Sequence, residues 1–123
     1  MSNRKNVVYL HTEIGVAMSK YENIMHGMKV VAKNVLPSTS HAYLYGSRAR
    51  GEAREDSDWD VLLVLDKDEI EDSDYDEVSY PFTYFGWENG ECIIPVLFTK
   101  KEWDENSYTS FNSNVEQDRI LIA

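Results

Sequence analysis

The decisive stretch of the sequence, residues 43–66, reads Tyr-Leu-Tyr-Gly-Ser-Arg-Ala-Arg-Gly-Glu-Ala-Arg-Glu-Asp-Ser-Asp-Trp-Asp-Val-Leu-Leu-Val-Leu-Asp. A short apolar run ends at Gly46-Ser47, where a strand would turn sharply into a helix. A basic segment follows, and Asp58 and Asp60 then lead into a second apolar run at residues 61–65. That run is too short for a stable helix and is rich in strand formers. The stretch therefore predicts a strand, a short helix with a loop, and a second strand.

The order of these residues suggests a chemistry. Asp58 and Asp60 are two residues apart at a strand, so their side chains should point the same way. Two carboxylates on one edge suit Mg²⁺, which prefers oxygen ligands and keeps positions open for substrate phosphates. Gly46 permits close approach of a backbone, and Ser47 would open a helix whose N–H groups attract phosphate. A phosphate site beside a metal site indicates phosphoryl or nucleotidyl transfer.

The stretch resembles the polymerase-beta-like nucleotidyltransferase superfamily, and in particular its minimal nucleotidyltransferase branch. The signature of that family is Gly-Ser, a helix, and then Asp-x-Asp at the head of a strand. The matching residues here are Gly46-Ser47 and Asp58-Trp59-Asp60. The other interpretation is a polar hairpin whose Arg and Asp side chains merely pair on the surface. An isolated Asp-x-Asp would favour that hairpin, but Gly-Ser at this distance favours the family.

The resemblance implies a Mg²⁺-dependent enzyme, with Mn²⁺ as the alternative metal. It would move a nucleoside monophosphate from an NTP, expected to be ATP, to a protein or small-molecule acceptor. Asp58 and Asp60 would act in catalysis as metal ligands, and Gly46 and Ser47 would hold the triphosphate. Either Arg48 or Arg50 would neutralise phosphate charge, which Arg does well through paired N–H donors. Surface salt bridges to nearby acids are the alternative for both arginines.

One departure from the family concerns a third carboxylate. Active members usually carry it on the next strand, where it completes the metal site or activates the attacking hydroxyl. The matching stretch here, residues 92–96, contains no acid. Glu91 is the nearest substitute and is the third predicted catalytic residue, with Glu88 further off. The alternative for both is an ordinary surface residue. A second hypothesis is therefore a catalytically weak or inactive nucleotide-binding module with a regulatory or interaction role.

Length, charge and cysteine content limit the class of protein. The chain has 123 residues, which suits one domain. With 12 basic and 22 acidic residues its net charge is −10, which argues against a duplex nucleic-acid partner. The single cysteine, Cys92, allows no internal disulfide, and no segment resembles a signal peptide or a membrane span. A cytoplasmic protein is expected.

The chain order predicts an α+β fold, with a small mixed sheet and helices packed on it, in the order helix, strand, helix, strand, helix, strand. Apolar spacing of three and four predicts a helix over residues 7–35 within an N-terminal segment, residues 1–37. A sheet core follows at residues 41–99, with strands near 41–45, 58–65 and 91–98. A capping box at Ser73-x-x-Asp76 would start a second helix, which Pro81 would kink. Pro95 places the third strand at an edge. A second capping box at Thr99-x-x-Glu102 would start a short helix, and residues 100–123 form C-terminal helices and a tail.

The small size of the chain also predicts a partner, because little surface remains to hold an acceptor. By resemblance, minimal nucleotidyltransferases often work beside an all-helical HEPN-type protein, in some cases as an antitoxin that modifies its toxin. The alternative is a homodimer that docks through the N-terminal helix.

Overall fold

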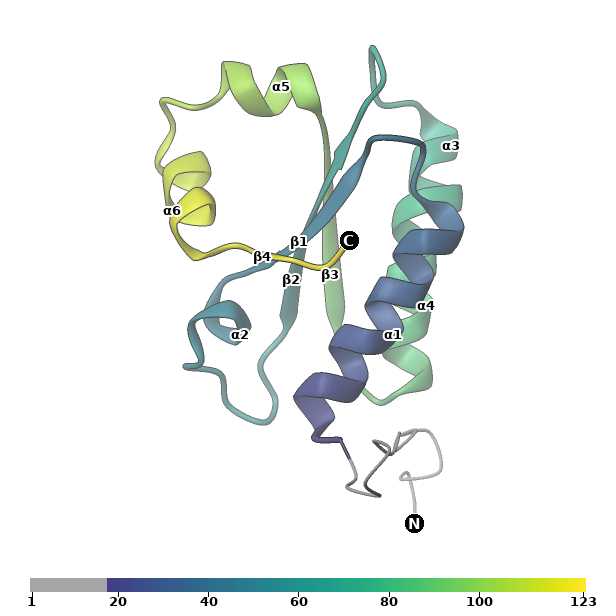
Figure 1. Ribbon diagram of the computed structural model, residues 1–123, viewed down its shortest axis with the longest axis vertical. Coiled ribbons are helices and arrows are strands. Elements are labelled where there is room, and N and C mark those ends of the chain that lie inside the picture. Colours follow the sequence, from purple (N-terminus) through teal and green to yellow (C-terminus); the bar gives the residue numbers. More distant parts are fainter. Residues whose placement is uncertain (1–17) are drawn as a thin grey trace.

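The structure, a computed structural model, describes residues 18–123, which form a four-stranded sheet with helices on both sides (Figure 1). The strands lie in the order β3-β2-β1-β4. Their bounds are β1 (His41–Tyr45), β2 (Trp59–Leu65), β3 (Ile93–Thr99) and β4 (Ile120–Leu121). Strand β1 pairs antiparallel with β2 and β4, and β2 pairs parallel with β3. The predicted α+β class with a small mixed sheet is confirmed, and β3 with its Pro95 is an edge strand as expected.

The alternation of side chains along β2 divides the molecule into two sides. Trp59, Val61 and Leu63 pack in the main core against residues of helices α1 (Lys20–Val35) and α4 (Tyr80–Glu88). Leu62 and Val64 pack on the opposite side with residues of α5 (Lys100–Glu105) and α6 (Ser110–Asp118). We call these the α1–α4 side and the α5–α6 side. Because side chains two residues apart along a strand share a face, Asp60 belongs to the α5–α6 side. Asp58 lies just before β2, and its charge acts on Asp60.

Helix α1 confirms the predicted N-terminal helix from Lys20 to Val35, whereas the prediction was wrong for residues 18 and 19, which lie before the helix start. It begins at a capping box in which Ser19 and Glu22 satisfy each other's backbone N–H groups. Its buried face includes Ile24, Met28 and Ala32, so the methionine stripe is core here. The predicted portion before residue 18 lies outside the described residues.

The second helical region begins two residues earlier than the predicted Ser73 box, which was wrong. Helix α3 (Asp72–Asp74) is capped by a reciprocal pair between Glu71 and Asp74. Lys67 binds both of these carboxylates and anchors the start. A π-helix (Tyr75–Ser79) then leads directly into α4. Pro81 lies in the first turn of α4, directly after the change from π-helical to α-helical hydrogen bonding.

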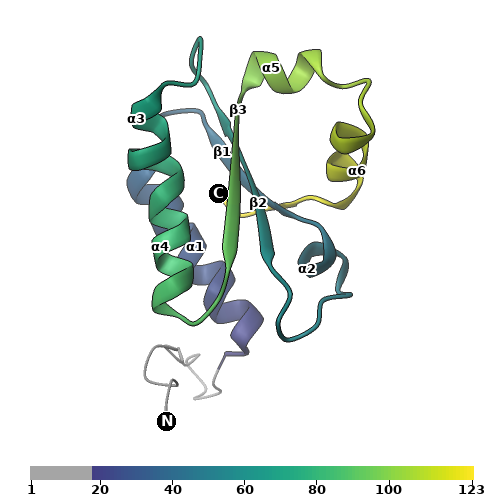
Figure 2. The ribbon, with the colours of Figure 1, turned by 180° about the vertical axis from the view of Figure 1, so that it is seen from behind.

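The C-terminal part closes the α5–α6 side. The predicted capping box at Thr99 and Glu102 is present and starts α5. Helix α6 follows, and the chain ends with β4 against β1 (Figure 2). Among residues 18–123, no helix has the length and apolar character that crossing a membrane requires.

Candidate functional site

Gly46 and Asp60 lie in direct contact at the point where β1 turns into the short helix α2 (Ser47–Arg50). Gly46 has φ 77° and ψ −159°, a conformation open essentially to glycine alone. A Cβ on Gly46 would lie 2.5 Å from Asp60 Oδ2. The register explains the contact, because Tyr45 and Asp60 are partners across the β1–β2 pair. The glycine is therefore required both by the turn and by the carboxylate beside it.

Asp58 and Asp60 form an acidic pair at the beginning of β2. Asp58 is exposed and Asp60 is partly buried. Burial, with the charge of Asp58 added, raises the pKa of Asp60, while Arg50 opposes that shift. Burial raises the pKa of Tyr45 to about 12, and Asp60 contributes. The site thus holds negative charge that a nearby cation would stabilise.

The position beside Asp60 on β3 is occupied by Ile94. The two residues are register partners in the parallel β2–β3 pair, so Ile94 also faces the α5–α6 side. Its side chain is apolar and 41% exposed. Cys92 is exposed two residues earlier, and burial, with Asp58 contributing, raises the pKa of its thiol. Within residues 18–123, no three His, Cys, Asp or Glu side chains gather as a metal site.

The structure separates the two predicted phosphate-binding arginines. Arg50 lies near Asp60 and donates to Glu52 at 2.9 Å and to Asp118 of α6 at 2.8 Å. Arg48 instead lies with its guanidinium carbon 4.5 Å from the ring centre of Trp59, which belongs to the α1–α4 side. Two residues on a helix are about 200° apart, which explains the separation. Of these two arginines, only Arg50 lies near the acidic pair.

Glu91 lies with Arg48 around Trp59. Its carboxylate accepts a hydrogen bond from Trp59 Nε1 at 2.9 Å and pairs with Lys20 Nζ at 2.8 Å. Arg48 also donates to the carbonyl of Ser57 at 2.8 Å, immediately before Asp58. These contacts hold the indole of Trp59 and the loop before β2 from the α1–α4 side of the sheet. The hydrogen bonds, ion pairs and ring contact of the Arg48 and Glu91 side chains are thus with Trp59, Lys20, each other and the loop before β2, and within the described residues none of them is with Asp58 or Asp60.

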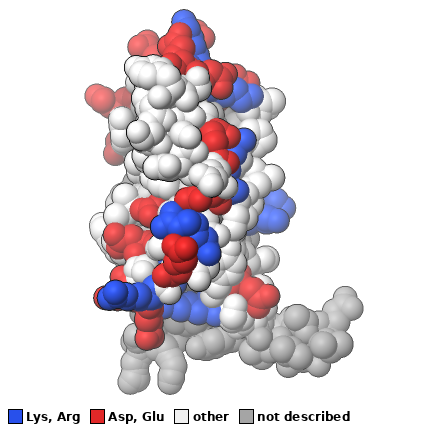
Figure 3. All heavy atoms as spheres, turned by 90° about the vertical axis from the view of Figure 1, so that its left-hand side faces the viewer, with Lys and Arg blue, Asp and Glu red and all other residues white. Residues whose placement is uncertain are grey.

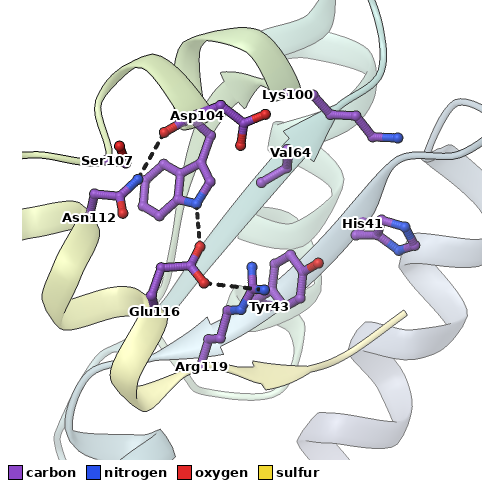
Figure 4. A pocket seen from close by; sticks show the side chains of 10 residues that line it. His41, Tyr43, Val64, Lys100, Asp104, Ser107, Asn112, Glu116 and Arg119 are labelled. Atoms are coloured by element: carbon purple, nitrogen blue, oxygen red, sulfur yellow. Dashed lines mark hydrogen bonds and ion pairs between the residues drawn. The ribbon is translucent and has the colours of Figure 1, made fainter.

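A pocket of about 600 Å³ lies on the α5–α6 side, towards the other end of the strands (Figure 4). Tyr43 and Val64 contribute to it from the sheet, while Trp103 Nε1 donates to Glu116 at 2.6 Å on its helical wall. Arg119 stacks over Tyr43 at 4.3 Å. The sequence reasoning missed this pocket because its lining comes from four separate elements. The sequence signal for this pocket was the alternation of side chains along β1 and β2, which places Tyr43 and Val64 on the same face of the sheet as Asp60.

Acidic and basic side chains are interleaved over the surface of this side (Figure 3). The face shown there, formed by α2, α5 and α6, carries no continuous basic surface of the kind that binds duplex phosphates.

The Gly-Ser turn and the acidic pair lie in the segment that a family model matches. Residues 28–83 match the family model described as polymerase beta, nucleotidyltransferase. The match covers the segment that carries the motif, and the resemblance seen in the sequence is confirmed over that segment. Among curated proteins, no sequence matches the chain significantly.

Two solved structures share the fold. One is a toxin–antitoxin crystallised with AMP-PNP, which is 13% identical, with a TM-score of 0.56 over 80% of this chain and 72% of that chain. The other is a proposed nucleotidyltransferase from Sulfolobus solfataricus, which is 21% identical, with a TM-score of 0.51 over 82% of this chain and 80% of that chain. At these identities the likeness concerns the fold.

Proposed function

We propose that this domain binds a nucleoside triphosphate with Mg²⁺ and transfers the nucleoside monophosphate to an acceptor. The single observation that carries the proposal is the contact of Gly46 with the Asp60 carboxylate. A backbone free of Cβ and a metal-type carboxylate meet at one point. The family match of residues 28–83 and the fold shared with a protein crystallised with AMP-PNP support it. ATP is the proposed donor, and Mn²⁺ is the alternative metal.

Each residue near the turn has a proposed task. Gly46 and Ser47 receive the triphosphate, and Asp58 and Asp60 hold the metal. Both are hard oxygen donors on one face, so they fit Mg²⁺. When bound, the metal would neutralise phosphate charge and polarise the phosphoryl group. Arg50 adds a positive charge beside the acidic pair.

The acceptor would approach across the α5–α6 side, which contains both Asp60 and the pocket floored by Tyr43. A hydroxyl of a protein side chain or of a small molecule is the proposed nucleophile. Because one fold relative is a toxin–antitoxin, we propose a protein partner as the acceptor, of the HEPN type or a second copy of this chain.

A second candidate function rests on Ile94. This residue stands beside Asp60 where a third carboxylate would complete the site. Without a base there, the acceptor hydroxyl lacks an internal proton acceptor, a loss that typically costs 10²–10⁴-fold in rate. The second candidate is therefore a module that binds nucleotide and regulates a partner without efficient transfer.

Calorimetry with Mg²⁺ and AMP-PNP tests the binding step. Replacing Asp58 and Asp60 together with Ala should abolish metal-dependent binding and leave the fold intact, because neither side chain is fully buried. A matched control replaces the exposed acids Asp68 and Glu69 with Ala, which changes the net charge equally. Unchanged affinity in the first variant would remove the acidic pair from the site. Pyrophosphate release from ATP, with and without an added acceptor protein, then separates the enzyme from the binding module.

A further inference from the structure

Helix α4 is apolar on two opposite sides, and within residues 18–123 only one of them is covered. Phe82, Phe85 and Gly86 face the core or α1. The outward side presents Tyr80, Tyr84 and Trp87, which are 48%, 49% and 60% exposed. Their rings lie together, with Tyr80 6.2 Å from Tyr84 and 6.1 Å from Trp87 between centroids. A helix that is apolar all round is normally buried, so this aromatic ridge indicates a docking surface.

Acidic side chains border the aromatic ridge. Asp76 and Glu77 lie about one turn before Tyr80, and both are exposed. At the other end, the charge of Glu88 raises the pKa of Tyr84. No Lys or Arg occurs anywhere in residues 68–99. The surface that covers the ridge should therefore be basic.

A basic surface of this kind lies on the neighbouring helix of the same chain. Helices α1 and α4 lie side by side on one side of the sheet, and they run in opposite directions (Figures 1 and 2). The exposed face of α1 carries His26, Lys29 and Lys33, with Val30 47% exposed between them. Among the described residues, neither Lys29 nor Lys33 has an ion-pair partner.

We infer that two copies of this chain associate through the outer face of α1 and α4, about a two-fold axis parallel to both helices. This axis places α1 of each copy against α4 of the other, so that basic side chains meet the acid-bordered aromatic ridge. A two-fold axis across the helices would instead set α4 against α4, with acid facing acid. Charge complementarity therefore selects the first arrangement.

The levels of the charged residues agree with this arrangement. Gly27 lies against the ring of Phe85, which fixes the two helices relative to each other. At about 1.5 Å per residue, Lys33 and Ser79 are each about 9 Å from that contact, in the same direction. A two-fold axis parallel to the helices leaves each residue's position along the axis unchanged, so Lys33 of one copy meets the region of Glu77 in the other. Lys29 falls near Tyr84 in the same way, within reach of a cation–π contact.

The size of the surface predicts a weak, reversible dimer. Helix α1 and the continuous helical segment of α3, the π-helix and α4 (residues 72–88) are each about 24 Å long and about 10 Å wide. Together they offer roughly 500 Å² per copy, near the lower limit of specific interfaces. The inference does not depend on transfer chemistry, since Asp60 faces the opposite side of the sheet and stays open in the dimer.

Sedimentation velocity of the full chain over a wide concentration range tests the dimer, which should reach twice the 14.2 kDa of the chain. Trp87→Ala should weaken association at least about tenfold, as loss of a central aromatic does. Tyr108→Ala, at an 84% exposed residue between α5 and α6, is the control and should change nothing. A chain that remains monomeric throughout, or equal effects of the two variants, would overturn the proposal.

Charge exchange tests the pairing itself. Lys33→Glu and Glu77→Lys should each weaken the dimer, and the combined variant should recover most of the association at unchanged net charge. Lys101→Glu on α5 controls for the added negative charge. A combined variant as weak as the two single variants would refute the proposed register, and circular dichroism shows that each variant is folded.

Discussion

Replacement of Gly46 by Ala tests whether the turn is built around Asp60. The backbone at φ 77° and ψ −159° is strained for any residue with a Cβ, at about 1–3 kcal/mol. The new methyl would also start 2.5 Å from Asp60 Oδ2. Moving the carboxylate aside into a poorer rotamer adds about 0.5–1.5 kcal/mol. Gly46→Ala should therefore lower the free energy of unfolding by about 2–4 kcal/mol.

The matched control is Gly51→Ala at the other end of α2. Gly51 also has a positive φ, 74°, but a Cβ there would meet nothing within 4 Å. Backbone strain alone predicts about 1–2 kcal/mol for this variant. Urea denaturation gives both free energies, and calorimetry with Mg²⁺ and AMP-PNP gives binding, which Gly46→Ala should abolish and Gly51→Ala should retain. Equal destabilisation, or normal binding by Gly46→Ala, would refute the idea that glycine makes room for the carboxylate.

Three further substitutions test the acids around the site. Because the pKa of Asp60 is raised from 3.8, the stability that this carboxyl contributes is lost as pH rises through its folded-state pKa. Asp60→Asn should therefore have a higher melting temperature than the native chain at pH 7. In thermal scans without metal, the difference in melting temperature should close towards pH 3. Ile94→Asp places a carboxylate beside Asp60 and should increase pyrophosphate release at least about tenfold, whereas Leu121→Asp at another exposed strand position should not. Glu91→Gln should keep release within about threefold and cost about 1 kcal/mol of stability through its contacts with Trp59; a tenfold loss of release in a folded protein would instead return Glu91 to the catalytic set.

The sequence was sufficient for the elements that depend on local pattern. Alternating strand residues and the capping box at Thr99 and Glu102 predicted the strands and α5 near their observed bounds, whereas the capping box that starts α1 at Ser19 was not predicted. The direction of β3 was not predictable from period alone, since it depends on the crossover through α4 that returns the chain parallel to β2. The misplaced start of α3 has a similar cause, because Lys67 selects Glu71 and Asp74 from a run rich in acids.

The residues of the candidate site could be predicted from the sequence, but not the side of the sheet on which each side chain outside the strands lies. The spacing of Asp58 and Asp60 gave their shared face directly. Arg48 and Glu91 were assigned by sequence proximity, yet both contact Trp59 from the α1–α4 side. Their destination depends on the buried indole, whose N–H requires an acceptor and whose ring accepts a guanidinium. No spacing rule contains that requirement.

Two local features meet at the same point, and they bear on the choice between a transferase and a module that binds nucleotide without efficient transfer. Gly46 adopts a conformation that only glycine tolerates, and Asp60 carries a charge that burial and Asp58 both disfavour. Neither feature strengthens the packing of the sheet, since an ordinary turn and a neutral residue would be more stable there. A disfavoured charge beside an open glycine backbone is offset when a cation binds there together with its anion. The missing acid at Ile94 therefore bears on the rate of transfer, while the geometry of Gly46 and Asp60 still favours a domain that binds a cation with a phosphate.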